Sequence, residues 1–298
     1  MSVFSVGGSS PSDSGFELKS ARFDNSGHLY KTFASAGDRK TWTFSCWMKK
    51  SAVADQGSIF GVDGGAPGAQ FLFYTDGTFG FTNKDGGGST TIALRTTQVF
   101  RDPSAWQHFC LALDTNVSSP AADRVKLYIN GSRVTEFSTA TYPSEDEECA
   151  INDADKHSVG KDYRWGDVYD GYLAETYFID GSALTPASFG ETNELTNQWQ
   201  PKNPTDIKKA VTFGLNGFYL PFSNDALTTS FTDSAERSVY TVTANGNAHT
   251  DTTVKKIGTA SLQLDGTGDY LSFPDNSFVW GTGDFTMEAW IKFGTPVP

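Results

Sequence analysis

The fold class is decided by the run Trp42-Thr43-Phe44-Ser45-Cys46-Trp47-Met48-Lys49. One face of this run carries Trp42, Phe44, Cys46 and Met48, and the other carries Thr43, Ser45, Trp47 and Lys49. Such alternation is typical of a half-buried antiparallel strand. Similar runs follow at near-regular spacing, and no helical period is sustained over about 11 residues. The sequence therefore predicts an all-β chain.

Tight turns join several of these runs. Asp76-Gly77 and Asn130-Gly131 supply the positive φ angles that short hairpin turns require. Many short strands connected in this way indicate a two-sheet antiparallel sandwich with a jelly-roll arrangement. Its inward-facing residues are predicted to be Phe44, Cys46, Phe109, Leu111, Leu127, Ile129 and Leu173.

An internal repeat divides the chain. Ser20–Tyr30 recurs in outline as Ser261–Leu271, and Trp42–Lys49 recurs as Asp284–Lys292. A repeat this long indicates duplicated domains rather than a solenoid. The predicted parts are an N-terminal arm at 1–15, a first sandwich at 16–190, a polar connector at 191–212 and a partial second sandwich at 213–298.

The second copy has about half the length of a sandwich of this type. Its strands would carry an uncovered apolar face, which includes Leu262, Leu264, Leu271, Phe273, Phe285, Met287, Ala289 and Ile291. Soluble chains avoid such faces. We therefore expect either that the natural polypeptide continues past Pro298 or that another subunit supplies the facing sheet.

Composition limits the partners. The 298 residues suffice for two domains, and the formal net charge is −12. A negative field repels phosphate backbones and anionic lipid, so neither nucleic acid nor a membrane is an expected partner. The N-terminus lacks the pattern of a secretory signal. Cys46, Cys110 and Cys149 are expected to be free thiols, since three cysteines cannot all pair within the chain.

Catalytic patterns are not evident in the sequence. The acidic run Glu145–Glu148 has no alternating apolar partners and indicates a solvated loop rather than the paired carboxylates of a glycosidase. The four histidines, His28, His108, His157 and His249, are dispersed and lack metal-ligand spacing. Neither a Gly-x-Ser-x-Gly motif nor a phosphate-binding glycine loop is present. We therefore expect a protein that is not an enzyme.

Several segments, taken in order, resemble a known family. They are Phe23–Tyr30, Phe44–Met48, Trp106–Asp114, Val125–Gly131, Asp170–Glu175 and, in the second copy, Leu264–Leu271 with Phe285–Ile291. Together they are similar to concanavalin A-like lectin/glucanase sandwiches of the laminin G and pentraxin type. The run Asp170–Phe189, followed by Phe213–Phe222, resembles virion structural proteins of tailed phages, especially marine ones.

The resemblance implies a non-enzymatic virion protein of a fibre, spike or capsid decoration, assembled in the host cytoplasm. Its implied partners are other virion proteins, further copies of itself and host cell-surface glycans. An alternative function is that of a lectin-like adhesin that binds host glycans.

One loop combines the residue types that sugar sites use. Tyr163, Trp165, Asp167 and Asp170 place aromatic rings and carboxylates together, the rings for sugar C–H faces and the carboxylates for hydroxyls. The alternative is that Tyr163 and Trp165 cover the end of the sandwich. Trp47 also stands on the polar face of its strand, which indicates either a contact surface or packing beneath a loop.

Calcium is bound at the sandwich rim in many members of the family that the chain resembles. Asp114 with Asn116, or Asp63 beside Gly64-Gly65, could contribute oxygen ligands. Neither group forms a dense ligand loop, so a turn is the simpler interpretation of both. No residue is assigned to a metal, and no cofactor is expected beyond calcium.

Overall fold

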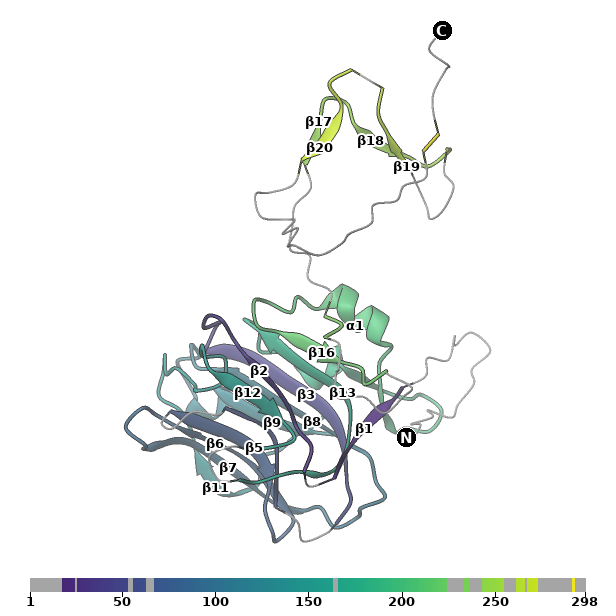
Figure 1. The fold of residues 1–298 in the computed structure, drawn as a ribbon. Coiled ribbons are helices and arrows are strands. Elements are labelled where there is room, and N and C mark those ends of the chain that lie inside the picture. The colour runs from purple at the N-terminus through teal and green to yellow at the C-terminus, as the bar shows by residue number, and fades with distance from the viewer. Residues whose placement is uncertain are drawn as a thin grey trace. The chain divides into compact units, whose positions relative to one another are not determined.

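The computed structural model describes residues 18–24, 26–52, 56–62, 67–162, 166–223, 233–235, 243–254, 261–265, 267–272 and 291–292. The chain forms two compact units, Met1–Glu236 and Arg237–Pro298 (Figure 1). The first unit contains two antiparallel seven-stranded sheets, named here sheet I and sheet II. This confirms the predicted all-β sandwich.

Sheet I is built around two long strands. Its order is β1 (Ser20–Asp24), β13 (Asp170–Asp180), β3 (Thr41–Lys50), β8 (Gln107–Asp114), β9 (Val125–Ile129) and β10 (Ser132–Arg133). A seventh strand, β16 (Phe218–Leu220), pairs with β13 on the same edge as β1. The alternating run Trp42–Lys49 thus lies in β3, between β13 and β8 (Figure 1).

Sheet II contains the hairpin predicted at Asp76-Gly77, and the hairpin predicted at Asn130-Gly131 joins β9 and β10 of sheet I. The order of sheet II is β11 (Phe137–Thr141), β7 (Thr90–Val99), β6 (Thr78–Lys84), β5 (Gly68–Phe73), β4 (Gly57–Val62), β12 (Lys156–Val159) and β2 (Leu29–Thr32). Gly77, with a φ of 80°, forms the turn between β5 and β6. Strands β11 and β2 are the two edges of this sheet.

The core lies between the two sheets and is rich in phenylalanine. Phe44 of sheet I stacks on Phe60 of sheet II with ring centroids 4.5 Å apart. The residues predicted to face inward are all buried in this cluster, namely Phe44, Cys46, Phe109, Leu111, Leu127, Ile129 and Leu173. Alternation along each strand therefore identified the core correctly.

The segment after β13 differs from the expected connector and second domain. It contains a 3-10 helix (Pro186–Ser188), the hairpin of β14 (Gly190–Thr192) and β15 (Trp199–Pro201), and helix α1 (Pro204–Ala210). Ile207, Val211, Phe213 and Tyr219 are buried in a second apolar cluster that includes Tyr177 of β13. Because β16 also extends sheet I, residues 186–222 belong to the first unit. We name this segment the strap.

A buried carboxylate at the end of β13 joins the strap to the sandwich. Asp180 Oδ1 accepts hydrogen bonds from Asp38 N (2.8 Å) and Asn152 Nδ2 (2.6 Å), and its Oδ2 accepts one from Asn216 N (3.0 Å). Asn216 Nδ2 in turn donates to Asn152 Oδ1 (2.9 Å). A Cβ atom on Gly37 would overlap Asp180 and Asn152, so glycine is required where these segments converge.

The second unit has two described pairs of strands. They are β17 (Thr243–Asn245) with β20 (Tyr270–Ser272), and β18 (His249–Asp251) with β19 (Ser261–Gln263). β19 and β20 begin 241 residues after β1 and β2, respectively (261 − 20 and 270 − 29), in line with the repeat. Of the second repeated strand, only Ile291 and Lys292 are among the described residues. The second sandwich stays a prediction.

No helix in the described residues has the length and apolar character needed to cross a membrane. Cys46, Cys110 and Cys149 are buried free thiols. Burial raises the pKa of the Cys149 thiol to about 12. All three sulfur atoms are therefore poor nucleophiles at neutral pH.

Replacing Leu127 tests the packing between the sheets. Leu127 is fully buried, and removal of a leucine side chain from such a site leaves a cavity. We predict that Leu127→Ala lowers the free energy of unfolding by about 2–5 kcal/mol, measured by chemical denaturation. The control is Leu195→Ala, because Leu195 is 85% exposed and should change stability by less than about 0.5 kcal/mol. Equal stability of the two variants would contradict this packing.

Candidate functional site on the open half of sheet I

The outer face of sheet I is divided into two halves. The strap covers one half, where Tyr177, Ile179 and Cys110 pack against Phe189, Ile207 and Phe213. The other half carries the outward residues at the opposite end of the same strands. These residues are Arg22 of β1, Tyr172 of β13, Lys49 of β3, and Trp106 immediately before β8.

These four side chains form a row across neighbouring strands, named here the cation–aromatic row. Arg22 pairs with Tyr172, and Tyr172 pairs with Lys49. Trp106 follows in register, since Met48 pairs with Gln107. At a strand spacing of about 4.8 Å, the row extends roughly 14 Å across the sheet. The ring centroids of Tyr172 and Trp106 are 6.4 Å apart.

Cations flank the Tyr172 ring on both sides. The Arg22 guanidinium carbon lies 5.3 Å from the ring centroid and Lys49 Nζ lies 5.1 Å from it. Arg22 also pairs with Asp170, with 2.5 Å between Nη2 and Oδ1, and donates to the Gly171 carbonyl oxygen. The row therefore offers two partly exposed rings with donors and one carboxylate beside them.

Only part of the sequence-predicted loop lies in the described residues. Tyr163 and Trp165 lie outside them. The Asp167 carbonyl oxygen accepts a hydrogen bond from Asp162 N (2.8 Å), and Asp170 begins β13. Asp170 is thus the predicted residue that the structure brings to the row.

The row itself was not predicted from the sequence. The alternating pattern of each strand does place Arg22, Lys49 and Tyr172 on the outward face. The pattern does not give the order of the strands in the sheet, which decides whether these residues are neighbours. That order brings together residues separated by up to 150 positions, as with Arg22 and Tyr172.

Trp47 is buried beneath the strap, which decides between its two predicted roles. Its side chain is 4% exposed and stacks on His108 with centroids 5.2 Å apart. His108 stacks in turn on Trp199 of β15 at 6.0 Å. Trp47 therefore packs beneath a loop and does not form an exposed contact surface.

Ser45 and His108 form a buried pair that is unsuited to nucleophilic catalysis. Trp199 Nε1 donates to His108 Nδ1 (3.1 Å), so the ring proton of neutral His108 is on Nε2. Nε2 then donates to Ser45 Oγ (2.8 Å). Burial lowers the pKa of His108 to about 3. A histidine that already donates to the serine cannot act as its base.

Glu175 has a raised pKa, as many catalytic acids do, but its buried carboxyl group is closed to a substrate. Its side chain is 2% exposed, and burial raises its pKa to about 7. Tyr177 Oη donates to Oε2 (2.5 Å), and Tyr219 Oη donates to Oε1 (2.9 Å). The two tyrosine rings stack 4.4 Å apart. Both carboxyl oxygens are thus enclosed by the sandwich and the strap.

The acidic run has partners of its own. Glu148 pairs with Arg39 (3.0 Å) and Asp146 with Lys40 (3.2 Å). Glu147 Oε2 accepts from Ser144 N (2.9 Å). These carboxylates fix the loop before β12 to the start of β3, which agrees with their interpretation as a solvated loop.

The calcium candidates show the geometry of a turn. Asp114 Oδ1 accepts hydrogen bonds from the backbone and side-chain nitrogens of Asn116, both at 3.2 Å. Asp63, Gly64 and Gly65 lie outside the described residues. Within the part of the chain that the structure describes, no three His, Cys, Asp or Glu side chains are grouped as metal ligands would be.

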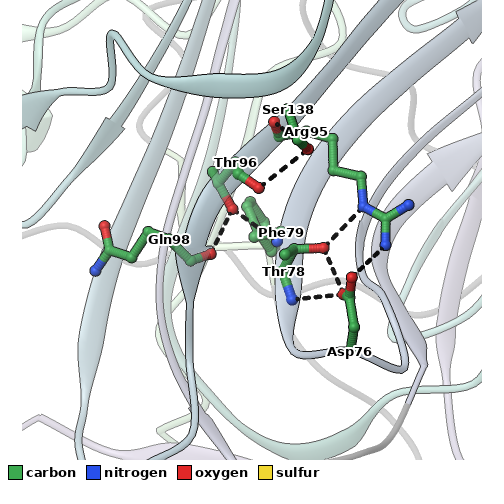
Figure 2. Close-up of polar contacts among 7 residues, drawn as sticks. All are labelled: Asp76, Thr78, Phe79, Arg95, Thr96, Gln98 and Ser138. Atoms are coloured by element: carbon green, nitrogen blue, oxygen red, sulfur yellow. Dashed lines mark hydrogen bonds and ion pairs between the residues drawn. The ribbon is translucent and has the colours of Figure 1, made fainter.

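A second polar cluster lies on sheet II (Figure 2). Arg95 donates to Thr78 Oγ1 (2.9 Å) and to Asp76 Oδ2 (2.6 Å), and its guanidinium lies 4.0 Å from the Tyr74 ring centroid. Hydrogen bonds from Thr78, together with Arg95, lower the pKa of Asp76. These groups satisfy one another and fix the Asp76-Gly77 hairpin to β7, so their first role is structural.

The sequence profile of the concanavalin A-like lectin/glucanases superfamily matches residues 23–188, more than half of the chain. The chain belongs to this superfamily. No curated protein sequence matches it.

Several solved structures are similar to this superfamily member at low identity. The heptameric SAP-like pentraxin of Limulus polyphemus is 15% identical, with a TM-score of 0.42, over 61% of this chain and 91% of the pentraxin. A putative carbohydrate binding protein from Bacteroides ovatus is 14% identical, with a TM-score of 0.45, over 74% and 56%. Tailspike protein 2 of Escherichia coli O157:H7 bacteriophage CAB120 is 12% identical, with a TM-score of 0.38, over 56% and 23%.

The buried carboxyl predicts a pH dependence of stability. The pKa of Glu175 is raised from 4.5 to about 7 in the folded state, so folding favours the protonated form. Its contribution is complete below about pH 4.5 and is lost as the pH rises to about 7, a loss of about 3 kcal/mol. The Glu175→Gln side chain stays neutral at every pH. Between about pH 4.5 and pH 7 the unfolding free energy of the native protein should therefore fall by about 3 kcal/mol relative to that of the variant. A pH-independent difference would contradict the assignment.

Proposed function

We propose that the first unit is a non-catalytic carbohydrate-binding domain whose site is the cation–aromatic row with Asp170. The observation that carries the proposal is the pair of partly exposed rings, Tyr172 and Trp106, side by side on the half of sheet I that the strap leaves open. Membership of a superfamily that includes lectins supports the same class of ligand.

The row has the two kinds of group that sugar recognition needs. Aromatic faces accept the apolar C–H surface of a pyranose, and a few fixed polar groups orient its hydroxyls. Here Arg22 and Asp170 hold each other in place, which lowers the entropic cost of ordering them on binding.

The absence of enzyme activity is part of the proposal. Ser45 and Glu175, the two groups that most resemble catalytic residues, are buried beneath the strap. A glycosidase needs two carboxyl groups that reach the same glycosidic bond. Asp170 instead forms an ion pair with Arg22.

We also propose that the protein is a virion subunit in which this domain contacts other virion proteins, further copies of itself and host glycans. The resemblance of Asp170–Phe189 and Phe213–Phe222 to phage structural proteins supports this role. The two runs meet in the pairing of β13 with β16. Addition of the purified chain to particles that lack it tests the role, and failure to bind would contradict it.

Truncation of the two rings should abolish sugar binding. We predict that Trp106→Ala and Tyr172→Ala each lose the glycan-array signal of the native chain, because each removes one stacking face, while the melting temperature changes little. Tyr270→Ala is the control, since Tyr270 is an exposed tyrosine of the second unit. Full retention of signal in both ring variants would place the site elsewhere.

The loop before β13 is the predicted extension of this site. We predict that Trp165→Ala weakens the array signal without loss of stability, because Trp165 precedes Asp170 by only five residues. The array is probed with and without calcium, which tests the metal at the same time. Unchanged binding together with a lowered melting temperature would show that Trp165 only covers the end of the sandwich.

A further inference from the structure

A cleft opens between an edge strand of each sheet, β2 of sheet II and β16 of sheet I. Leu29 of β2 lies on one wall and Leu220 of β16 on the other. The cleft has a volume of about 520 Å³, within the range of sites that hold small molecules. No member of the cation–aromatic row lines it, so the cleft is separate from the proposed sugar site.

The floor of the cleft is made of buried aromatic rings. Phe33, Phe60 and Phe218 line it with His157, whose ring stacks on Phe33 with centroids 4.2 Å apart. Main-chain groups bond to both ring nitrogens of His157, at 2.9 and 3.0 Å. Burial lowers the pKa of His157 to about 4, so its ring is uncharged at neutral pH. The floor therefore offers apolar aromatic contacts, which suit a flat ring.

The polar lining residues lie on β2 and immediately before it. Lys31 of β2 pairs with His157 of β12, and residues directly opposed in an antiparallel pair project from the same face of the sheet. Because His157 is part of the floor, the Lys31 side chain projects on the cleft side of β2. His28, the residue before β2, also lines the cleft, and a neutral imidazole has one ring N–H donor.

The charge of the cleft is opposite to that of the whole chain. The formal net charge of the chain is −12, yet none of the described residues that line the cleft is acidic. Lys31 is exposed and forms no ion pair with another described residue. Lys156, on the other face of the same sheet edge, lies with Nζ 4.5 Å from the ring centroid of Tyr30. The local charge beside β2 therefore favours an anion.

We propose that this cleft binds a small aromatic carboxylate. The aromatic body lies among Phe33, Phe60 and Phe218. The carboxylate lies at the mouth, where it pairs with the Lys31 ammonium and accepts a hydrogen bond from His28. A charged pair beside apolar surface is stronger than one in bulk water, which favours a carboxylate over a neutral ligand of the same shape.

Calorimetric titration of the full chain with 2-naphthoate and with its uncharged amide, 2-naphthamide, tests the proposal. We expect naphthoate to bind at least about fivefold more tightly than naphthamide, because Lys31 pairs only with the charged probe. Lys31→Met keeps an unbranched apolar side chain without the charge. This variant should weaken naphthoate binding about fivefold and leave naphthamide binding unchanged.

Lys126→Met is the matched control. Lys126 is on the outward face of β9, near the other edge of sheet I, so this variant removes the same charge from the chain and should leave both affinities unchanged. An unchanged naphthoate affinity in Lys31→Met would overturn the proposal. Aggregation of that variant with unchanged affinity would instead assign Lys31 to protection of the β2 edge, where inward charges discourage pairing with other chains.

A larger side chain on the wall tests the apolar part of the site. Leu220 is partly exposed, and Leu220→Trp should fill the cleft and abolish binding of both probes. Leu29→Trp provides the same test from the facing wall if Leu220→Trp does not fold. Equal affinity of the native chain for the two probes, or no binding of naphthoate, would overturn the proposal. Loss of naphthoate binding in Trp106→Ala but not in Leu220→Trp would also overturn it, because the probe would then lie on the cation–aromatic row.

Discussion

The buried carboxylate of Asp180 is the interaction on which the arrangement of the first unit depends. It ends β13 and accepts hydrogen bonds from the loop before β3, from Asn152 and from Asn216 of the strap. A carboxylate in this position is stable only if its oxygens are satisfied, since an unpaired buried charge is costly. The network therefore fixes where the chain goes after β13. The strap, the covered half of sheet I and the pairing of β16 with β13 all follow from that path.

Because the strap covers only one half of the outer face of sheet I, the two halves differ in solvent exposure. Beneath it, groups that could react in water are enclosed. His108 lies between the rings of Trp47 and Trp199, and the carboxyl group of Glu175 accepts hydrogen bonds from two tyrosine hydroxyls. Beyond it, Tyr172 and Trp106 keep part of their surface exposed. If the strap covered the whole outer face, Tyr172 and Trp106 would be buried. Without the strap, the apolar side chains of Ile179 and Tyr177 would be exposed to solvent. Under the proposed function, this division would leave the cation–aromatic row accessible to a glycan while the rest of the outer face stays covered.

The sequence predicted what depends on local pattern. Alternation in Trp42–Lys49 determined the inward face, and Asp76-Gly77 predicted a turn that the structure confirms. Within the strap, residues 191–212 were predicted to be a polar connector and residues 213–222 the start of a second sandwich, because their burial depends on contacts made at long range. Trp199 bonds to His108, 91 residues earlier, and Ile207 is the one buried residue of α1. The cation–aromatic row was missed for a related reason. Three of its members lie in β1, β13 and β3 and the fourth lies just before β8, and no local pattern encodes the order of these strands. Asp170 was named as a candidate because it lies in a local run of aromatic and acidic residues, and its role in binding stays a prediction.

The claim that sugar binds on the open half of sheet I can be tested most directly by hydroxyl-radical footprinting of the native chain with mass spectrometry. The probe is the glycan that gives the strongest array signal, compared with the free protein. The account predicts that Trp106 and Tyr172 are oxidised in the free protein and protected when the glycan is bound, while Trp47 stays unmodified in both states. Saturating glycan that leaves the oxidation of Trp106 and Tyr172 unchanged would contradict it.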